Sequence, residues 1–316
     1  MLKKLISFIL FQVFFAAIVG PFLLFWGPFD TIKAIAVGSI VTSRHPQVAS
    51  IFLSQAEIDS ILNKNEELQA AMPTGADVER KKVVSADGIV IEDIRGNNGT
   101  SFKGKVMLIK DPSRVIVANT NAIGESGERV SDMVKEFNAV AGINAGGFND
   151  PNGKGNGGFP QGITMSQGKV VYNDSGNSRQ MIIGMDDKGK LVIDNLSLSE
   201  MQARGIRDAV SFFPQLVKDG KGLVKGDGGW GVAPRTGIGQ KADGTIIFVV
   251  IDGRQLQSLG ATLKDLQKVF LDYGAVTAAN LDGGSSTTMV YNGQVINKPA
   301  DIFGERYVPT TFVVKP

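Results

Sequence analysis

From residue 83 to the C-terminus, the sequence is made of short apolar segments separated by glycine, asparagine and aspartate, a rhythm typical of a β-rich fold. The chain has 39 glycines among its 316 residues, and their position between apolar segments indicates tight turns rather than disorder. We therefore predict a β-rich mixed α/β fold, with a central sheet and a few flanking helices, over residues 83–316. The expected strands are 106–110, 114–119, 139–144, 168–173, 180–185, 190–194, 245–252 and 310–315.

Helices are expected to be fewer than strands. Three segments have helical periodicity: 130–138, 198–204 and 262–273. Residues 289–297 are predicted to form a hairpin, because Asn292-Gly293 separates two alternating runs.

One part of this domain predicts a strand–helix–strand crossover. Residues 245–251 form a continuous apolar run, as in a strand buried on both faces, and Asp252 follows directly. The helix 262–273 begins with a capping-box pattern, and a second strand, 276–281, ends at Asp282. If the two strands are parallel neighbours, their carboxyl ends lie at one sheet edge, where ligands bind in open α/β sheets. Both aspartates would then face one site.

The first 29 residues carry an apolar run that follows Lys3 and Lys4. The run is long enough to cross a bilayer, which takes about 20 apolar residues. A cleaved signal peptide, with a shorter apolar region, and a buried core helix are the alternatives. We expect residues 1–29 to be a transmembrane signal anchor, and the two lysines place residues 30 onward outside the cytoplasm. The protein is thus expected to be a single-pass protein of the cell membrane with an extracytoplasmic domain.

Residues 30–82 are predicted to connect this anchor to the main domain. Ser54 and Glu57 have capping-box spacing, and the apolar residues that follow indicate a helix near 55–70, ending before Pro73. This region either packs on the main domain or acts as a stalk, and the sequence favours neither arrangement.

The composition excludes several kinds of chemistry. There are no cysteines, which removes thiol nucleophiles, disulfides and thiolate-bound zinc. The single histidine, His45, lies far from every motif, which argues against a Ser-His-Asp triad or a histidine-ligated zinc site. The net charge is only +2, so nucleic acid is not an expected partner.

Four glycine-flanked polar motifs stand out: INAGGF (143–148), PRTGIG (234–239), VIDGRQ (250–255) and NLDGGSSTTM (280–289). Each has a purely structural interpretation when taken alone, since Asp-Gly is a common turn and an arginine after proline is usually a surface residue. The predicted crossover weakens that interpretation, because it brings two of the acids to one edge.

The four motifs, in this order, resemble those of the phosphodiester glycosidase family, whose members include N-acetylglucosamine-1-phosphodiester α-N-acetylglucosaminidases and bacterial exopolysaccharide-associated proteins. The resemblance covers residues 83–316. It implies hydrolysis of a sugar-1-phosphodiester at the anomeric carbon, releasing the sugar and a phosphomonoester. A carboxylate must act as nucleophile or activate water, and a second can stabilise the oxocarbenium-like transition state.

The resemblance suggests Asp282 and Asp252 as these carboxylates, and Arg235 as the residue that binds the phosphate charge bidentately. Arg254 either contacts the phosphate or pairs with Asp252. Asn144 and Asn280 suit sugar hydroxyls or an N-acetyl group, and main-chain amides near Gly283 suit an oxyanion. The expected substrate-binding residues are Asn144, Gly146, Gly147, Arg254, Asn280, Gly283, Gly284, Ser285 and Ser286.

No cofactor is required by this chemistry. The glycine-rich segment 152–158 lacks a P-loop ending and is expected to be a flexible loop over the site. The oxygens of Asn149, Asp150 and Asn152 suit a calcium ion, although they lack the charge and spacing of an EF-hand. The expected partners are a sugar-phosphate polymer of the envelope or an exopolysaccharide, and the membrane. The alternative function is a non-catalytic polysaccharide-binding or envelope-assembly module.

Overall fold

The computed structural model describes residues 47–61, 79–84, 88–97, 101–151, 155–255, 257–301 and 303–316, with residues 12, 14–15, 19–28, 33, 36–37 and 40 nearer the N-terminus. Much of the expected anchor, 1–29, lies outside these residues. Among the described ones, no helix combines the length and apolar character needed to cross a membrane. The expected capping box is present, since the Ser54 amide donates to Glu57 Oε2 at 2.8 Å, and residues 55–61 are helical. The rest of that helix, 62–70, lies outside the described residues.

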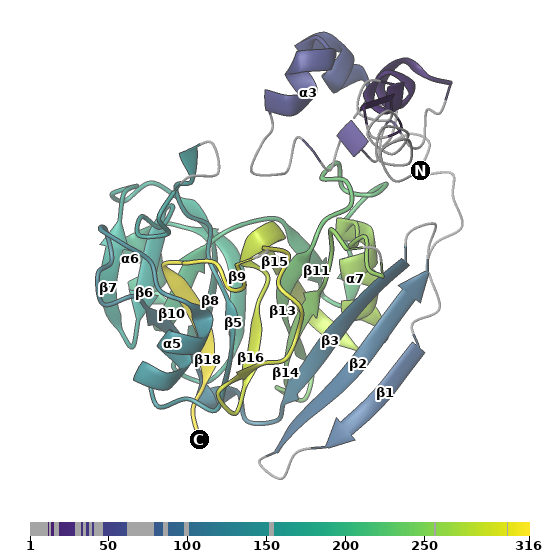
Figure 1. Cartoon of the computed structure of the whole chain (residues 1–316). Coiled ribbons are helices and arrows are strands. Elements are labelled where there is room, and N and C mark those ends of the chain that lie inside the picture. The colour runs from purple at the N-terminus through teal and green to yellow at the C-terminus, as the bar shows by residue number, and fades with distance from the viewer. Residues whose placement is uncertain are drawn as a thin grey trace.

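The described part of the chain folds mainly into three antiparallel sheets, so the β-rich prediction is confirmed (Figure 1). The first sheet has the order β1 (Glu79–Val84), β2 (Ile89–Asn97), β3 (Ser101–Ile109), β14 (Ile246–Ile251), β13 (Arg235–Lys241), β15 (Ala275–Leu281), β11 (Gln215–Lys218) and β12 (Lys221–Gly222). The second has the order β7 (Lys169–Asn173), β6 (Ile163–Ser166), β10 (Ile206–Ser211), β8 (Gln180–Asp186) and β9 (Leu191–Leu196). The third has the order β17 (Gln294–Val295), β16 (Met289–Tyr291), β5 (Ala141–Asn144), β18 (Thr310–Val314) and β4 (Val115–Asn119). Each of the expected strands is present.

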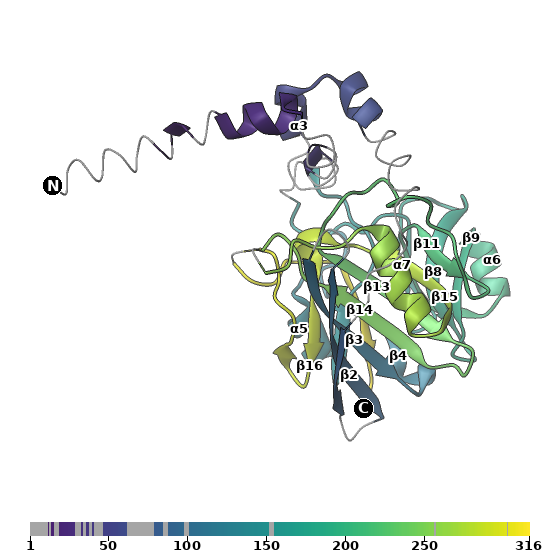
Figure 2. The ribbon, with the colours of Figure 1, turned by 90° about the vertical axis from the view of Figure 1, so that its right-hand side faces the viewer.

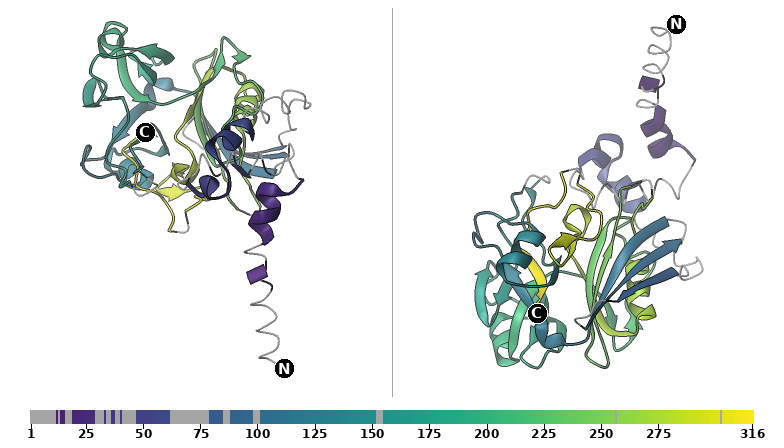
Figure 3. Two further views of the ribbon diagram at one scale, coloured as in Figure 1. Left: turned by 90° about the horizontal axis from the view of Figure 1, so that it is seen from above. Right: turned by 60° about the horizontal axis from the view of Figure 1, so that its bottom comes forward.

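Figure 3 shows the second sheet on the opposite side of the molecule from β1, β2 and β3. The main core contains buried side chains from all three sheets, among them Phe248 of the first sheet, Ile183 of the second and Phe312 of the third. Burial of these side chains is the main force that holds the sheets together.

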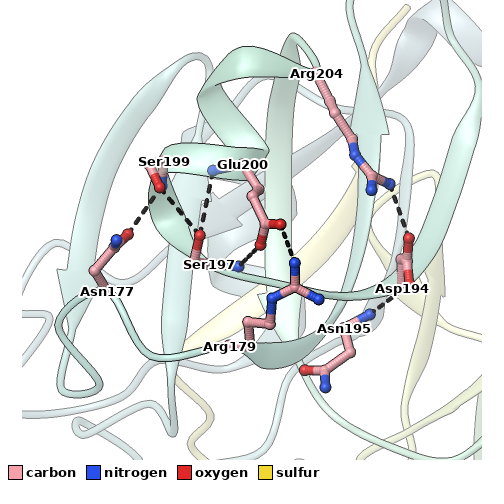
Figure 4. Close-up of polar contacts among 8 residues, drawn as sticks. All are labelled: Asn177, Arg179, Asp194, Asn195, Ser197, Ser199, Glu200 and Arg204. Atoms are coloured by element: carbon pink, nitrogen blue, oxygen red, sulfur yellow. Dashed lines mark hydrogen bonds and ion pairs between the residues drawn. The ribbon is translucent and has the colours of Figure 1, made fainter.

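The three predicted helices of the domain are confirmed as α5 (Val130–Glu136), α6 (Leu198–Ala203) and α7 (Leu263–Asp272), while α3 (Gln47–Phe52) lies before the sheets. At α6, Ser197 and Glu200 form a capping box, and Glu200 also pairs with Arg179 (Figure 4). Nearby, Arg204 pairs with Asp194 at 2.8 Å on the surface. The predicted hairpin is formed by β16 and β17, with positive φ at Asn292 and Gly293 as a two-residue turn requires.

The strand–helix–strand unit is present, but its strands are not neighbours as the prediction assumed. β14 and β15 run in the same direction with β13 between them, antiparallel to both. The carboxyl ends of β14 and β15 and the start of β13 therefore lie at one edge of the sheet. This arrangement places Arg235 between the strand ends that carry Asp252 and Asp282.

β13 was not among the expected strands because glycine interrupts its apolar pattern. Figure 2 shows α7 lying across β13, β14 and β15. A Cβ atom on Gly237 or Gly239 would lie 2.8 Å from the ring of Phe270 on α7. The two glycines thus leave room for the helix to pack closely on the sheet.

Candidate active site

A pocket of about 310 Å³ lies at the edge where β13 begins and β15 ends. Side chains of both charges line it, together with two aromatic rings and a glycine-rich turn. The lining residues are Asp150, Phe212, Trp230, Ala233, Arg235, Arg254, Asp282, Gly283, Gly284, Ser285 and Arg306.

Asp282 follows β15 directly and is the carboxylate that the sequence placed at this edge. Burial raises the pKa of its carboxyl group to about 6, against the lowering effects of the Ser286 hydroxyl and the Arg306 charge. Its Oδ2 atom is buried and has no hydrogen-bond partner in the described structure. A carboxyl group with a pKa near neutrality can accept or donate a proton at physiological pH.

Asn144 holds the main chain at Asp282 through a buried hydrogen bond. Its side chain is fully buried, and Nδ2 donates to the main-chain oxygen of Asp282 at 2.5 Å. Its Oδ1 accepts from the Thr236 hydroxyl at 2.8 Å and from the Thr288 amide at 3.1 Å. The structure therefore places Asn144 away from the pocket surface, with its amide group bonded to protein atoms.

Arg235 begins β13 and lines the pocket, although its side chain is almost completely buried. Its Nε atom donates to the carbonyl of Ala261 at 3.0 Å, and Nη2 donates to those of Trp230 and Gly231 at 3.1 and 2.7 Å. Burial lowers the pKa of this guanidinium to about 10, so it remains charged at neutral pH. None of these three hydrogen bonds to main-chain carbonyls involves the Nη1 atom of Arg235.

The two Asp-Gly turns enclose the start of β13. A Cβ atom on Gly253 would lie 2.6 Å from the nitrogen of Pro234, and one on Gly283 would lie 2.8 Å from its oxygen. The amide of Gly284 donates to that oxygen at 2.9 Å. Packing against Pro234 is therefore a structural reason for the glycines. Arg254 projects to the same place, since a Cβ atom on Gly284 would lie 3.4 Å from its Nη2 atom.

Arg306 and Asp150 form an ion pair in the pocket that the motifs did not indicate. Arg306 Nη2 lies 2.6 Å from Asp150 Oδ1, and the two side chains are 9% and 20% exposed. The guanidinium also lies over the ring of Phe148, 4.7 Å from its centroid, and Nη1 donates to Ser285 Oγ at 3.4 Å. Asp150 appeared in the sequence only as a candidate calcium ligand, and no sequence signal marks Arg306.

Asp252 is not among the residues that line the pocket. Its Oδ1 atom accepts from Asn297 Nδ2 and from the Lys298 amide, both at 3.0 Å. Burial raises the pKa of its carboxyl group, and these two hydrogen bonds oppose that effect. The structure thus brings Asp282, Arg235 and Arg254 together and leaves Asp252 bonded to the segment after β17.

The other predicted binding residues lie around the pocket in different ways. Asn280 is buried, with Nδ2 donating to the Phe213 carbonyl at 3.0 Å and Oδ1 unpaired in the described structure. Gly146 and Gly147 are buried against β10 and Phe212, where added Cβ atoms would lie 2.8 and 2.6 Å from neighbours. Gly283, Gly284 and Ser285 line the pocket, and the buried Ser286 hydroxyl bonds to Asp282.

Three aromatic rings stand at one side of the pocket. Trp230 packs edge-on against Phe213 and Phe212, with centroids 5.2 and 6.1 Å apart. Phe212 and Trp230 line the pocket, and Phe213 is 53% exposed beside them. We refer to these three residues as the aromatic wall. Flat apolar surfaces of this kind suit the C–H face of a sugar ring.

The candidate calcium ligands and the predicted flexible loop fall partly outside the described residues, since these exclude 152–154. Of the three suggested ligands, Asp150 is paired with Arg306. In the described part of the chain, no group of three or more acidic or histidine side chains is placed to hold a metal ion.

The model of the phosphodiester glycosidase family matches residues 137–315, which include Asp150, Arg235, Asp282 and Arg306. The chain belongs to the phosphodiester glycosidase family. Among its relatives is the SPbeta prophage-derived uncharacterized protein YomE of Bacillus subtilis, 30% identical over 216 residues, which are 65% of this chain and 32% of YomE. N-acetylglucosamine-1-phosphodiester alpha-N-acetylglucosaminidase of Homo sapiens is 36% identical over 70 residues, which are 22% of this chain and 13% of the human protein. The match thus spans about a third of YomE and a smaller part of the human enzyme.

Solved structures share the fold of this phosphodiester glycosidase family member. The catalytic domain of zebrafish N-acetylglucosamine-1-phosphodiester alpha-N-acetylglucosaminidase, auto-inhibited by its pro-peptide, superposes with a TM-score of 0.59 at 22% identity. That match covers 78% of this chain and 85% of the zebrafish chain. A hypothetical protein from Synechocystis superposes with a TM-score of 0.54 at 16% identity, over 77% of this chain and 69% of that one.

Proposed function

We propose that this protein hydrolyses a sugar-1-phosphodiester, of the N-acetylglucosamine-1-phosphodiester kind, at the pocket that contains Asp282. The observation that carries the proposal is a carboxyl group with a pKa of about 6 in a pocket lined by three arginines, Arg235, Arg254 and Arg306. Guanidinium groups donate charge-assisted hydrogen bonds to phosphate oxygens, and the carboxyl group supplies the proton transfer that hydrolysis needs. Membership of the phosphodiester glycosidase family supports the same reaction class.

In the proposed reaction, the arginines hold the phosphate and the sugar ring stacks on the aromatic wall. Ionised Asp282 accepts a proton from a water molecule as that water attacks the anomeric carbon. The bond between this carbon and the phosphate oxygen breaks, and its electron pair leaves with the phosphate. The products are the free sugar and a phosphomonoester, whose added charge the arginines stabilise. Phosphate is a stable leaving group, so this chemistry requires little help from a general acid.

The activity is expected to depend on pH through Asp282. Because only the ionised carboxylate accepts a proton, kcat/KM should fall about tenfold per pH unit below about pH 6, the pKa of this group. The profile of kcat/KM against pH, measured with a soluble sugar-1-phosphodiester, checks this expectation. A fall in kcat/KM that begins only near pH 4, where an ordinary aspartate titrates, would contradict the assignment of Asp282 as the proton acceptor.

The reaction itself is tested by incubating the full chain with N-acetylglucosamine-1-phosphodiesters and with envelope polymers that contain sugar-phosphate links. Release of reducing sugar supports the enzyme. Binding of these glycans without release would instead support a non-catalytic polysaccharide-binding or envelope-assembly module, a role for which the exposed ring of Phe213 is suited.

The natural substrate proposed here is a cell-envelope or exopolysaccharide polymer outside the cytoplasm. The support is the apolar run in residues 1–29 after Lys3 and Lys4, which suits a signal anchor with the domain outside. The full chain should remain in the membrane fraction after an alkaline wash, whereas a chain lacking residues 1–29 should be released. Protease added to intact cells should cleave the domain, and complete protection would contradict this orientation.

A further inference from the structure

We propose that Asp150 and Arg306 form an exchangeable ion pair, in which the substrate phosphate takes Arg306 and the released Asp150 becomes the second carboxylate of the reaction. The inference rests on the proposed function, and it gives roles in the reaction to two residues that the sequence motifs did not indicate. It replaces Asp252, which does not line the pocket, as the partner of Asp282.

The geometry makes Arg306 available to a phosphate. Its short polar contact is the 2.6 Å pair with Asp150, while its bonds to Ser285 Oγ and to the Gly155 carbonyl are long, at 3.4 and 3.5 Å. Asp150 and Arg306 both line the pocket, so each is within reach of a ligand bound there. A phosphate oxygen offers the same acceptor chemistry as the carboxylate that it would displace.

Each partner is also held in place independently of the other. The ring of Phe148 lies 4.7 Å from the Arg306 guanidinium carbon, and the Gly155 amide donates to Asp150 Oδ1 at 2.7 Å. Loss of the ion pair therefore leaves both groups facing the pocket. Arg235 differs, because main-chain carbonyls accept from its Nε and Nη2 atoms with or without a ligand.

The exchange supplies negative charge where the reaction needs it. With Arg306 bound to phosphate, the Asp150 charge is no longer neutralised, and it lies close enough to Asp282 to affect that group electrostatically. As the bond to phosphate breaks, positive charge develops at the anomeric carbon, and an unpaired carboxylate stabilises it. Asp150 exchanges no atoms with the substrate in this step. Before substrate binds, its pairing with Arg306 avoids the cost of an unpaired charge.

The test compares the full chain with Asp150→Asn and with Asp194→Asn, a control that removes the carboxylate of a surface arginine pair. Binding of inorganic phosphate is measured by calorimetry, and kcat and KM with a sugar-1-phosphodiester. Since Asp150 competes with phosphate for Arg306, Asp150→Asn should bind phosphate about tenfold more tightly, while kcat falls by about 100-fold. Asp194→Asn should match the natural protein in both measurements.

A merely structural role for Asp150 would weaken phosphate binding and activity together. Equal or weaker phosphate binding by Asp150→Asn would overturn the inference, even in an active enzyme, and so would an undiminished kcat. Failure of the natural protein to release sugar from any phosphodiester would instead overturn the proposed function. Arg306→Gln provides a second check, because it should weaken phosphate binding and make that binding insensitive to the further substitution Asp150→Asn.

Discussion

Asp282→Asn is expected to lower kcat by about 10³-fold while the protein remains folded. An asparagine cannot accept the proton of the attacking water, and proton transfer by a positioned group contributes about 10² to 10⁴ in rate. Activity with a sugar-1-phosphodiester and the circular dichroism spectrum check the two parts of this expectation. Asp243→Asn, on an exposed turn, is the control and should retain normal turnover. Near-normal sugar release by Asp282→Asn would contradict the assignment.

The same substitution should make the protein more stable above pH 6. The pKa of Asp282 is about 6 in the folded protein and 3.8 in the unfolded chain, so the folded state binds this proton more tightly. Its contribution to stability is present below pH 3.8 and is lost as the pH rises through 6. At pH 8 the ionised buried carboxylate costs about 3 kcal/mol, which an uncharged asparagine avoids.

Urea unfolding at several pH values measures this effect. The difference in unfolding free energy between Asp282→Asn and the natural protein should grow as the pH rises from about 4 to about 7, and then level off. A gain in stability with a loss of activity is typical of a group that is kept in an unfavourable environment for function. A constant difference across this pH range would show that burial does not shift the pKa of Asp282.

The sequence predicted those parts of the fold in which local pattern and packing agree. The apolar run of β14 and the capped helix α7 were predicted because burial on both faces and helix capping leave direct local signals. β13 left no such signal, because Gly237 and Gly239 are determined by the ring of Phe270, which lies far along the chain. Tertiary packing thus hid the strand that separates β14 from β15.

Contacts between segments far apart in the chain also limited the prediction of the pocket. The predicted end of the strand 276–281 marked Asp282 as a site residue, and the resemblance to the family added Arg235 as the phosphate-binding residue. The contact between Asp150 and Arg306 joins two segments with no common motif, so only the folded chain brings them together. The motif around Asp252 marked a turn, in which Gly253 packs on Pro234. It did not mark a pocket residue, because the Asp252 carboxylate accepts a hydrogen bond from Asn297 instead.

Asn144→Ala is expected to destabilise the protein by about 3 to 5 kcal/mol, because one buried side chain holds three segments together. Its loss leaves the Thr288 amide and the main-chain oxygen of Asp282 without this partner, and leaves the Thr236 hydroxyl with the longer contact to Thr287 Oγ1 at 3.3 Å. Each unsatisfied buried group costs about 1 to 3 kcal/mol. Urea unfolding measures the change, and Asn195→Ala, at an exposed position on β9, should alter stability by less than about 0.5 kcal/mol.

Asn144→Ala gives different results depending on whether Asn144 supports the position of Asp282 or contacts the substrate. If Asn144 acts through the main chain of Asp282, Asn144→Ala should lose stability even without a ligand, and the remaining folded enzyme should show a reduced kcat more than a raised KM. A sugar contact predicts the reverse, with normal stability and a raised KM. Because its amide group is bonded to protein atoms on both sides, we expect the loss of stability to dominate.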